Sequence, residues 1–137
     1  MPGSAPVQVA VVGVILRGRR VLSLRRAQTN LAGPGLWETV SGRVERAEHP
    51  LDAIQREVRE ESQLGVEIDP RPVRSYGAPI RGWTVVVVYR AVYRSGEVVL
   101  SSEHDAYAWL TCAELAQRSS LPVLLSAVRT AMSLSPL

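Results

Sequence analysis

The chain has 137 residues, of which 46% are hydrophobic and 21% are charged, a composition typical of one globular domain with a real core. Its net charge of +3 is too small to indicate a nucleic-acid partner, and its apolar runs are too short to span a membrane. A single cysteine, Cys112, excludes an intramolecular disulfide framework and favours a reducing, cytoplasmic location.

The first part of the chain predicts a loose tail followed by a hairpin. Residues 1–6 carry no targeting signature, and we expect residues 7–137 to form a single domain. Beyond its first two residues, Val7–Leu16 is apolar on both faces of an extended chain, which indicates a buried central strand. After an Arg-Gly-Arg turn, Arg20–Leu24 predicts the hairpin partner of this strand. The segment Gln28–Gly35 has the composition of a loop.

The second half predicts further strands separated by polar connections. Val66–Ile68 is a short strand, and the prolines that follow it indicate a sheet edge. Tyr76–Gly82 has the composition of a mobile loop. Trp83–Tyr93 is the strongest strand signal, because β-branched and aromatic residues dominate it. We expect Glu97–Leu100 to pair back after a Ser-Gly turn, and Ala106–Leu110 to form the last strand.

Two helices are expected near the end of the chain. Thr111 and Glu114 have the spacing of a capping box, which predicts the start of a short helix. Pro122 suits the first turn of a final helix, in which Val123–Met132 carries apolar residues at helical spacing. The order of strands, one internal helix, strands and terminal helices predicts a mixed α/β fold with helices packed on a sheet.

The internal helix is the part of the chain around which a site can be built. Pro50 favours its first turn, and at about 100° per residue three apolar side chains form one stripe while three carboxylates share the neighbouring face. The stripe comprises Leu51, Ile54 and Val58, and the acidic face comprises Glu57, Glu60 and Glu61.

The acidic face needs a compensating charge. Arg56 only flanks it, so the carboxylates repel one another by roughly a few tenths of a kcal/mol per pair. One divalent cation would turn this repulsion into binding, and Mg²⁺ prefers such hard oxygen ligands together with substrate phosphates. The alternative is a solvated acidic face that holds no ligand.

The spacing around this helix carries a family resemblance. Gly42, five residues, Glu48, seven residues, then Arg56-Glu57-Val58-x-Glu60-Glu61-x-x-Leu64 resembles the Nudix box, Gly-x5-Glu-x7-Arg-Glu-U-x-Glu-Glu-x-Gly-U, with U aliphatic. The Trp-Glu pair before the box and the Glu-His-Asp stretch before the last strand are also similar to the family. The resemblance implies an α/β/α sandwich and hydrolysis of nucleoside diphosphates linked to another moiety, with Mg²⁺ or Mn²⁺.

The resemblance also implies roles for individual residues. Three box glutamates would hold the metal together with the backbone carbonyl of Gly42, and Glu57 is also a candidate general base. Arg56 would orient a box carboxylate by ion pairing, and Glu48 would steady the loop or the helix start. Glu103 would be a further metal-binding or catalytic acid, with an exposed loop acid as the alternative. The implied metal ligands are Gly42, Glu57, Glu60 and Glu61.

Four residues outside the box are candidates for substrate binding. Arg25 and Arg26 end the second strand, where a guanidinium suits a phosphate group, and simple surface exposure is the alternative. Trp37 and Tyr76 could stack on a base, with core or edge packing as the alternative. We interpret His104 as a surface histidine.

Two departures from the family pattern concern the ends of the box. Ser41 stands where the family has the first glycine of a Gly-Gly pair, and Gln63 replaces the closing glycine. Because a left-handed conformation costs a non-glycine residue roughly 1 kcal/mol, we expect Gln63 to stay helical and Gly65 to take the positive φ.

The sequence leaves three functions to compare. The first is a Nudix-type hydrolase, and the second is a non-catalytic Nudix-like module that senses nucleotides. The third is an RNA-binding or RNA-processing protein, which the absence of a clustered basic tract disfavours. The expected partner is a small molecule linked to a nucleoside diphosphate, whereas a membrane is not expected. Sugar nucleotides, nucleoside triphosphates and dinucleoside polyphosphates stay open as substrates, and a homodimer stays open as the assembly.

Overall fold

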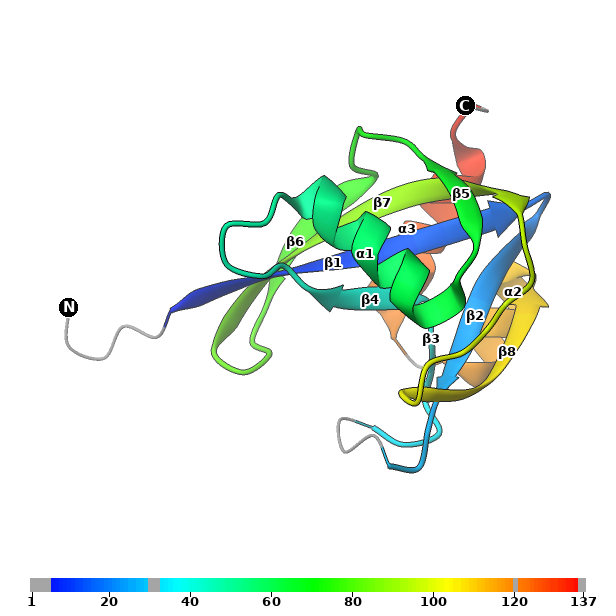
Figure 1. Ribbon diagram of the computed structural model, residues 1–137, viewed down its shortest axis with the longest axis horizontal. Coiled ribbons are helices and arrows are strands. Elements are labelled where there is room, and N and C mark those ends of the chain that lie inside the picture. Colours follow the sequence, from blue (N-terminus) through cyan, green and yellow to red (C-terminus); the bar gives the residue numbers. More distant parts are fainter. Residues whose placement is uncertain (1–5, 30–32, 120, 136–137) are drawn as a thin grey trace.

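The computed structural model describes residues 6–29, 33–119 and 121–135, so the predicted tail lies outside the described residues except for its last residue. One mixed sheet of eight strands carries helices on both faces (Figure 1). The strands are β1 (Val7–Arg17), β2 (Arg20–Arg26), β3 (Trp37–Glu38), β4 (Val40–Arg43), β5 (Gly65–Ile68), β6 (Arg74–Ala78), β7 (Trp83–Ser95) and β8 (His104–Leu110). The helices are α1 (Pro50–Ser62), α2 (Cys112–Arg118) and α3 (Pro122–Ser133).

The centre of the sheet is the parallel pair of β1 and β7, in register from Val7 opposite Trp83 to Leu16 opposite Val92. The main path of the sheet runs β3-β2-β1-β7-β5, while β4 pairs with β1, β6 with β7 and β8 with β2. Because helices cover both faces, the two central strands are apolar on both sides, as their sequences predicted. The mixed α/β sandwich is therefore confirmed.

Helix α1 covers one face of the sheet, in front of it in Figure 1. Its Ile54 and Val58 are buried against Val11 and Ile15 of β1. A Cβ at Gly13 would lie 2.8 Å from the Cδ1 of Ile54, so the glycine allows the helix to approach β1 closely. The core-facing stripe predicted for this helix is confirmed at both buried positions.

Helices α2 and α3 cover the opposite face, behind the sheet in Figure 1. Leu124 and Val128 of α3 and Leu115 of α2 pack against Val14 and Val88 of the central strands. Thr111 caps α2 with the predicted capping box, in which its hydroxyl accepts the N–H of the third helical residue. No helix in the described parts of the chain is both long enough and apolar enough to cross a membrane.

Two of the predicted elements are wrong. The expected loop Tyr76–Gly82 includes the end of β6, whose residues pair antiparallel with β7. The expected strand Glu97–Leu100 is not a strand, because the N–H of Val99 donates to the carbonyl of Ser62 at the end of α1 instead of to a ladder. Both errors arise because partners distant in sequence decide the backbone pairing of short segments.

The prediction for the end of α1 is also wrong. Gln63 takes the left-handed conformation, with φ 59°, and its N–H donates to the carbonyl of Arg59 at 3.1 Å. Gly65 is extended and begins β5, and a Cβ there would overlap the Oγ of Ser95. The cost of roughly 1 kcal/mol at Gln63 is offset because the turn buries Leu64, and burying a leucine contributes about 1.5–3 kcal/mol. Leu64 is 7% exposed in the core beside α1.

Candidate active site

A cavity of about 520 Å³ opens beside α1 and the central strands. We group most of its lining residues into a polar wall and an apolar wall. The polar wall consists of Arg26, Glu38, Thr39, Ser41, Gly42, Arg43, Glu57, Glu61, Glu103 and His104. The apolar wall consists of Ala10, Val11, Val12, Tyr76, Ile80, Val86, Leu121 and Leu124, and the polar residues Gln8, Arg81 and Thr84 line the cavity as well.

Two buried glutamates form the centre of the polar wall. Glu57 and Glu61 stand one turn apart on α1 and are 8% and 2% exposed. Burial is the main cause that raises the pKa of both carboxyls, and the Glu57 carboxyl raises the pKa of Glu61 further. The backbone N–H of Ser41 donates to Glu61 at 3.3 Å. Two buried acids this close to each other favour a shared positive partner.

Gly42 fixes the place of the Glu57 carboxyl. A Cβ on Gly42 would overlap the carboxyl carbon of Glu57, so the glutamate lies directly against the backbone of β4. This close approach explains why a glycine is needed here although its backbone is an ordinary strand. The neighbouring Ser41 keeps its side chain without disturbing either carboxylate.

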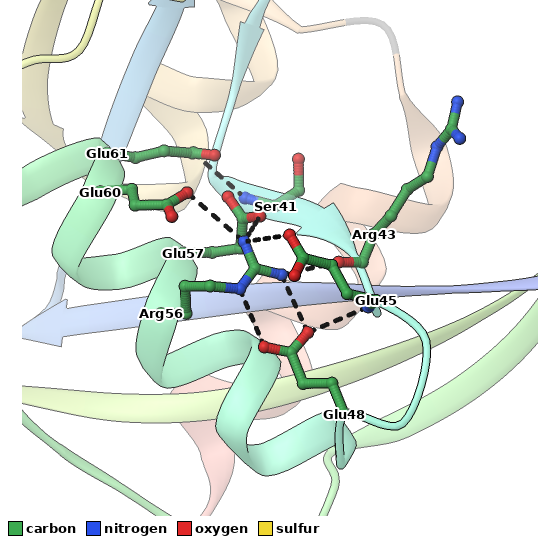
Figure 2. A network of polar contacts seen from close by, with 8 residues as sticks. All are labelled: Ser41, Arg43, Glu45, Glu48, Arg56, Glu57, Glu60 and Glu61. Atoms are coloured by element: carbon green, nitrogen blue, oxygen red, sulfur yellow. Dashed lines mark hydrogen bonds and ion pairs between the residues drawn. The ribbon is translucent and has the colours of Figure 1, made fainter.

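Arg56 lies at the centre of the acidic network rather than beside it (Figure 2). Its Nε donates to Glu48 at 2.8 Å, its Nη1 to Glu57 at 2.7 Å and to Glu60 at 3.4 Å, and its Nη2 to the carbonyl of Arg43 at 2.9 Å. The expectation that Arg56 only flanks the acidic face is therefore wrong, because its long stem folds back along the helix to the β4 carbonyl. It already neutralises part of the acidic charge.

Glu48 accepts two hydrogen bonds from the guanidinium of Arg56. Hydrogen bonds from Arg56, and from the backbone N–H of Glu45, lower the pKa of Glu48 to about 2. Glu48 does not line the cavity, so it holds the arginine from the side away from it. Arg56 is therefore bonded to Glu48 on one side and to Glu57 on the other.

The donor set fits a divalent cation in part. In residues 6–29, 33–119 and 121–135, no three His, Cys, Asp or Glu side chains converge on one point. The side chain of Glu60 is 56% exposed, bonded to Arg56 and outside the cavity lining. The carboxyls of Glu57 and Glu61 remain in the cavity with Gly42 and Glu103, and these are the hard oxygen donors that Mg²⁺ and Mn²⁺ bind.

The structure brings some predicted residues to the cavity and leaves others outside it. Glu103, Arg26 and Tyr76 line it. Arg25 does not, because its Nε donates to Asp105 at 2.6 Å. Trp37 does not either, since it packs against the α3 side of the core.

Sequence reasoning missed the part of the polar wall that lies next to β2. His104 is 5% exposed, so the interpretation as a surface histidine is wrong. Its Nε2 lies 2.9 Å from the Oε2 of Glu38, which also accepts from Arg26. The alternation of β8 could not have found His104, because the register shifts between His104 and Ala106.

Known proteins are similar to this chain in sequence or in architecture. The family model of the NUDIX domain matches residues 6–127. A MutT-like protein of Streptomyces ambofaciens is 37% identical over 111 residues, which cover 80% of this chain and 68% of the relative. The MutT protein of Methanosarcina mazei Go1 has a similar structure, with a TM-score of 0.79, 22% identity, and coverage of 92% of this chain and 93% of that one.

A second solved structure is that of an Ap4A hydrolase from C. elegans, with a TM-score of 0.77 and 22% identity over 90% of this chain and 93% of that one. At such identities the two solved structures show the fold, whereas the family model and the MutT-like relative show the family. The chain therefore belongs to the Nudix family, as a MutT-like pyrophosphohydrolase.

Proposed function

We propose that the chain hydrolyses a pyrophosphate bond in a nucleoside diphosphate derivative, with Mg²⁺ or Mn²⁺ bound at the polar wall. The observation that carries the proposal is the buried pair Glu57 and Glu61, packed against Gly42 inside the cavity. Cleavage of a pyrophosphate requires charge neutralisation on the phosphoryl oxygens and an oriented water molecule. A pair of buried carboxylates with raised pKa values is suited to binding the cation that supplies this neutralisation.

Each acid of the site has a proposed task. Glu57, Glu61 and the Gly42 carbonyl hold the cation, and the exposed Glu60 joins them by leaving its long contact with Arg56. Glu57 also stands as a candidate general base for the attacking water, and Arg56 keeps it in place through the 2.7 Å contact. Glu103 faces the same cavity and is the second candidate for the base.

The substrate is proposed to span the two walls. Arg26 lies on the polar wall, where a guanidinium can bind phosphate oxygens. Tyr76 lies on the apolar wall with Ile80 and Leu124, which offers an apolar surface to the nucleoside. Trp37 and Arg25 are left out of the proposed substrate site because they do not reach this cavity.

A turnover assay on a substrate panel tests the proposal. The panel contains a sugar nucleotide, ADP-ribose, nucleoside triphosphates, diadenosine tetraphosphate and capped RNA, each with Mg²⁺ or Mn²⁺. We expect metal-dependent turnover of at least one small nucleotide, and Glu57→Gln should lower kcat by roughly 10²–10⁴ if Glu57 is the general base. Glu67→Gln, at an exposed residue of β5 outside the cavity, is the matched control.

The panel also separates the competing functions. Tight nucleotide binding without turnover would indicate a sensor module, and turnover of capped RNA alone would indicate an RNA-processing enzyme. If Glu57→Gln keeps near-full activity while Glu103→Gln loses it, the base is Glu103.

A further inference from the structure

Three side chains from three different strands, all of which line the cavity, form a polar network on its wall. The Nε2 of His104 on β8 lies 2.9 Å from the Oε2 of Glu38 on β3, and the Nη2 of Arg26 on β2 donates to the Oε1 of Glu38 at 2.9 Å. Each carboxylate oxygen of Glu38 therefore has its own partner. The exposed fraction of the side chains rises from 2% at His104 through 11% at Glu38 to 21% at Arg26.

The most buried contact of this network is the one between His104 and Glu38. Burial raises the pKa of Glu38, but the hydrogen bonds of His104 and Arg26 outweigh it and lower that pKa, so the carboxylate is ionised and accepts the proton of Nε2. The other ring nitrogen, Nδ1, is buried and has no partner among the described residues. Leaving Nδ1 unpaired costs free energy. The hydrogen bond of Nε2 to Glu38 is therefore the polar contact that holds the ring in this place.

A bulge in the β2–β8 pair brings Arg26 and His104, the two ends of this polar network, opposite each other. Arg25 pairs with Ala106, whereas Arg26 pairs with His104, so Asp105 is an extra residue in β8. Bulges change the direction of the side chains that flank them. Here Arg25 meets Asp105 outside the cavity, while Arg26 and His104 both line it.

We propose that His104 is a positioning residue for phosphate binding, which through Glu38 holds the guanidinium of Arg26 toward the phosphate groups of the substrate. The inference rests on the proposed function for the identity of the substrate. A free arginine side chain has many rotamers, and ordering it on binding costs affinity. A guanidinium that is already held in the cavity binds a phosphate without that loss.

A binding experiment with a non-hydrolysable probe tests this role. The probe is methylenediphosphonate, measured by titration calorimetry with Mg²⁺ in all samples. His104→Gln keeps an N–H near the position of Nε2, whereas the shorter His104→Asn places its amide near Nδ1 and cannot reach Glu38. We expect the Asn variant to weaken binding about 10-fold or more, the scale of one lost charge-assisted hydrogen bond, and the Gln variant to bind nearly as the wild type does.

A double-mutant cycle separates positioning from a general structural effect. Arg26→Ala alone should weaken binding at least as much as His104→Asn does, and adding His104→Asn to Arg26→Ala should weaken it no further. With a substrate of the panel, His104→Asn should raise KM and leave kcat nearly unchanged. Thermal unfolding of each variant reports the folded fraction, and Glu38→Gln replaces His104→Asn if that variant does not fold.

Three results would overturn the inference. In the first, His104→Gln and His104→Asn weaken the binding of the diphosphonate equally. In the second, His104→Asn weakens this binding in the Arg26→Ala variant as much as it does in the wild type. In the third, the wild type does not bind the diphosphonate. A wild type that binds the probe with the expected pattern but hydrolyses no member of the panel overturns the proposed hydrolysis and leaves this inference standing.

Discussion

The contact between Gly42 and Glu57 shows how the absence of one side chain can define a reactive group. Because a Cβ on Gly42 would occupy the place of the Glu57 carboxyl, we expect Gly42→Ala to displace that carboxyl. A displacement of about 1 Å can cost roughly 10²-fold in rate, so kcat should fall by about that factor on the best substrate of the panel. Ser41→Ala, which adds no atoms at the neighbouring position, should keep most of the activity. A fully active Gly42→Ala variant would contradict the close packing.

The buried acids predict a metal-dependent stability. A cation that binds only the folded state stabilises it, so Mg²⁺ or Mn²⁺ should raise the unfolding temperature of the wild type. Glu61→Gln should abolish most of this shift, and without metal it should unfold no lower than the wild type, because it removes a carboxyl that burial disfavours in its charged form. Scanning calorimetry with and without metal measures both effects. The exposed pair of Arg94 and Glu67 offers a control, since Glu67→Gln should leave the shift unchanged.

At the scale of residues, the sequence predicted which residues lie at the site better than it predicted the contacts between them. Glu57 and Glu61 both line the cavity, because a helix puts residues four apart on one face. The contacts of Arg56 and His104 could not be predicted, since each depends on a partner from another strand or loop. No local periodicity reports such a distant partner.

At the scale of elements, the end of α1 makes a prediction about stability. Gln63 holds a φ of 59° that glycine adopts without the Cβ penalty. We therefore expect Gln63→Gly to raise the free energy of unfolding by roughly 0.5–1 kcal/mol, although the added freedom of the unfolded chain reduces the gain. Urea unfolding measures the difference. Gly65→Ala should change the free energy of unfolding little, because the added Cβ would meet only the Oγ of the exposed Ser95, which can rotate away. A lower free energy of unfolding for Gln63→Gly than for the wild type would contradict the structure.

The elements that the sequence predicted are those with a long one-dimensional pattern. The central strands β1 and β7 are apolar on both faces, and α1 and α3 carry helical stripes, so their patterns span many residues. The five residues of β6 carry too short a pattern, and only the pairing with β7 makes them a strand. The segment after β7 is apolar for a different reason, since Val98 and Leu100 pack against the core without joining the sheet.

At the scale of the whole molecule, one buried ion pair joins segments that are far apart in the chain. Asp69, after β5, accepts from Arg90 of β7 at 3.2 Å, and Arg90 also donates to the carbonyl of Ser135 beyond α3 at 2.6 Å. The side chains of Asp69 and Arg90 are each 4% exposed. Removing the Asp69 carboxylate would leave the buried Arg90 guanidinium without its acidic partner.

This pair predicts a pH dependence of stability. Hydrogen bonds from Arg71, and then from Arg90, lower the pKa of Asp69 to about 2, below the value of about 3.9 for an unfolded aspartate. The contribution of the ionised Asp69 to the free energy of unfolding is therefore complete above about pH 4–5 and is lost as the pH falls through about 2. The free energy of unfolding of Asp69→Asn should lie furthest below that of the wild type near pH 7, and the gap should narrow from pH 4 to pH 2. Urea unfolding of both proteins at three pH values measures this difference in free energy of unfolding. A difference that grows in acid would contradict the lowered pKa of Asp69.

The parallel pairing at the centre of the sheet also has a consequence during synthesis. Trp83 lies opposite Val7 although it comes 76 residues later, so β1 leaves the ribosome long before its partner strand exists. At about 5–20 residues per second, this interval lasts roughly 4–15 seconds. During it β1 has only β2 and β4 as strand partners and the helix α1 over one of its faces. A nascent chain stopped before β7 therefore exposes the edge and one face of its most apolar strand, which makes that stage of translation the one at which the chain is most prone to aggregate.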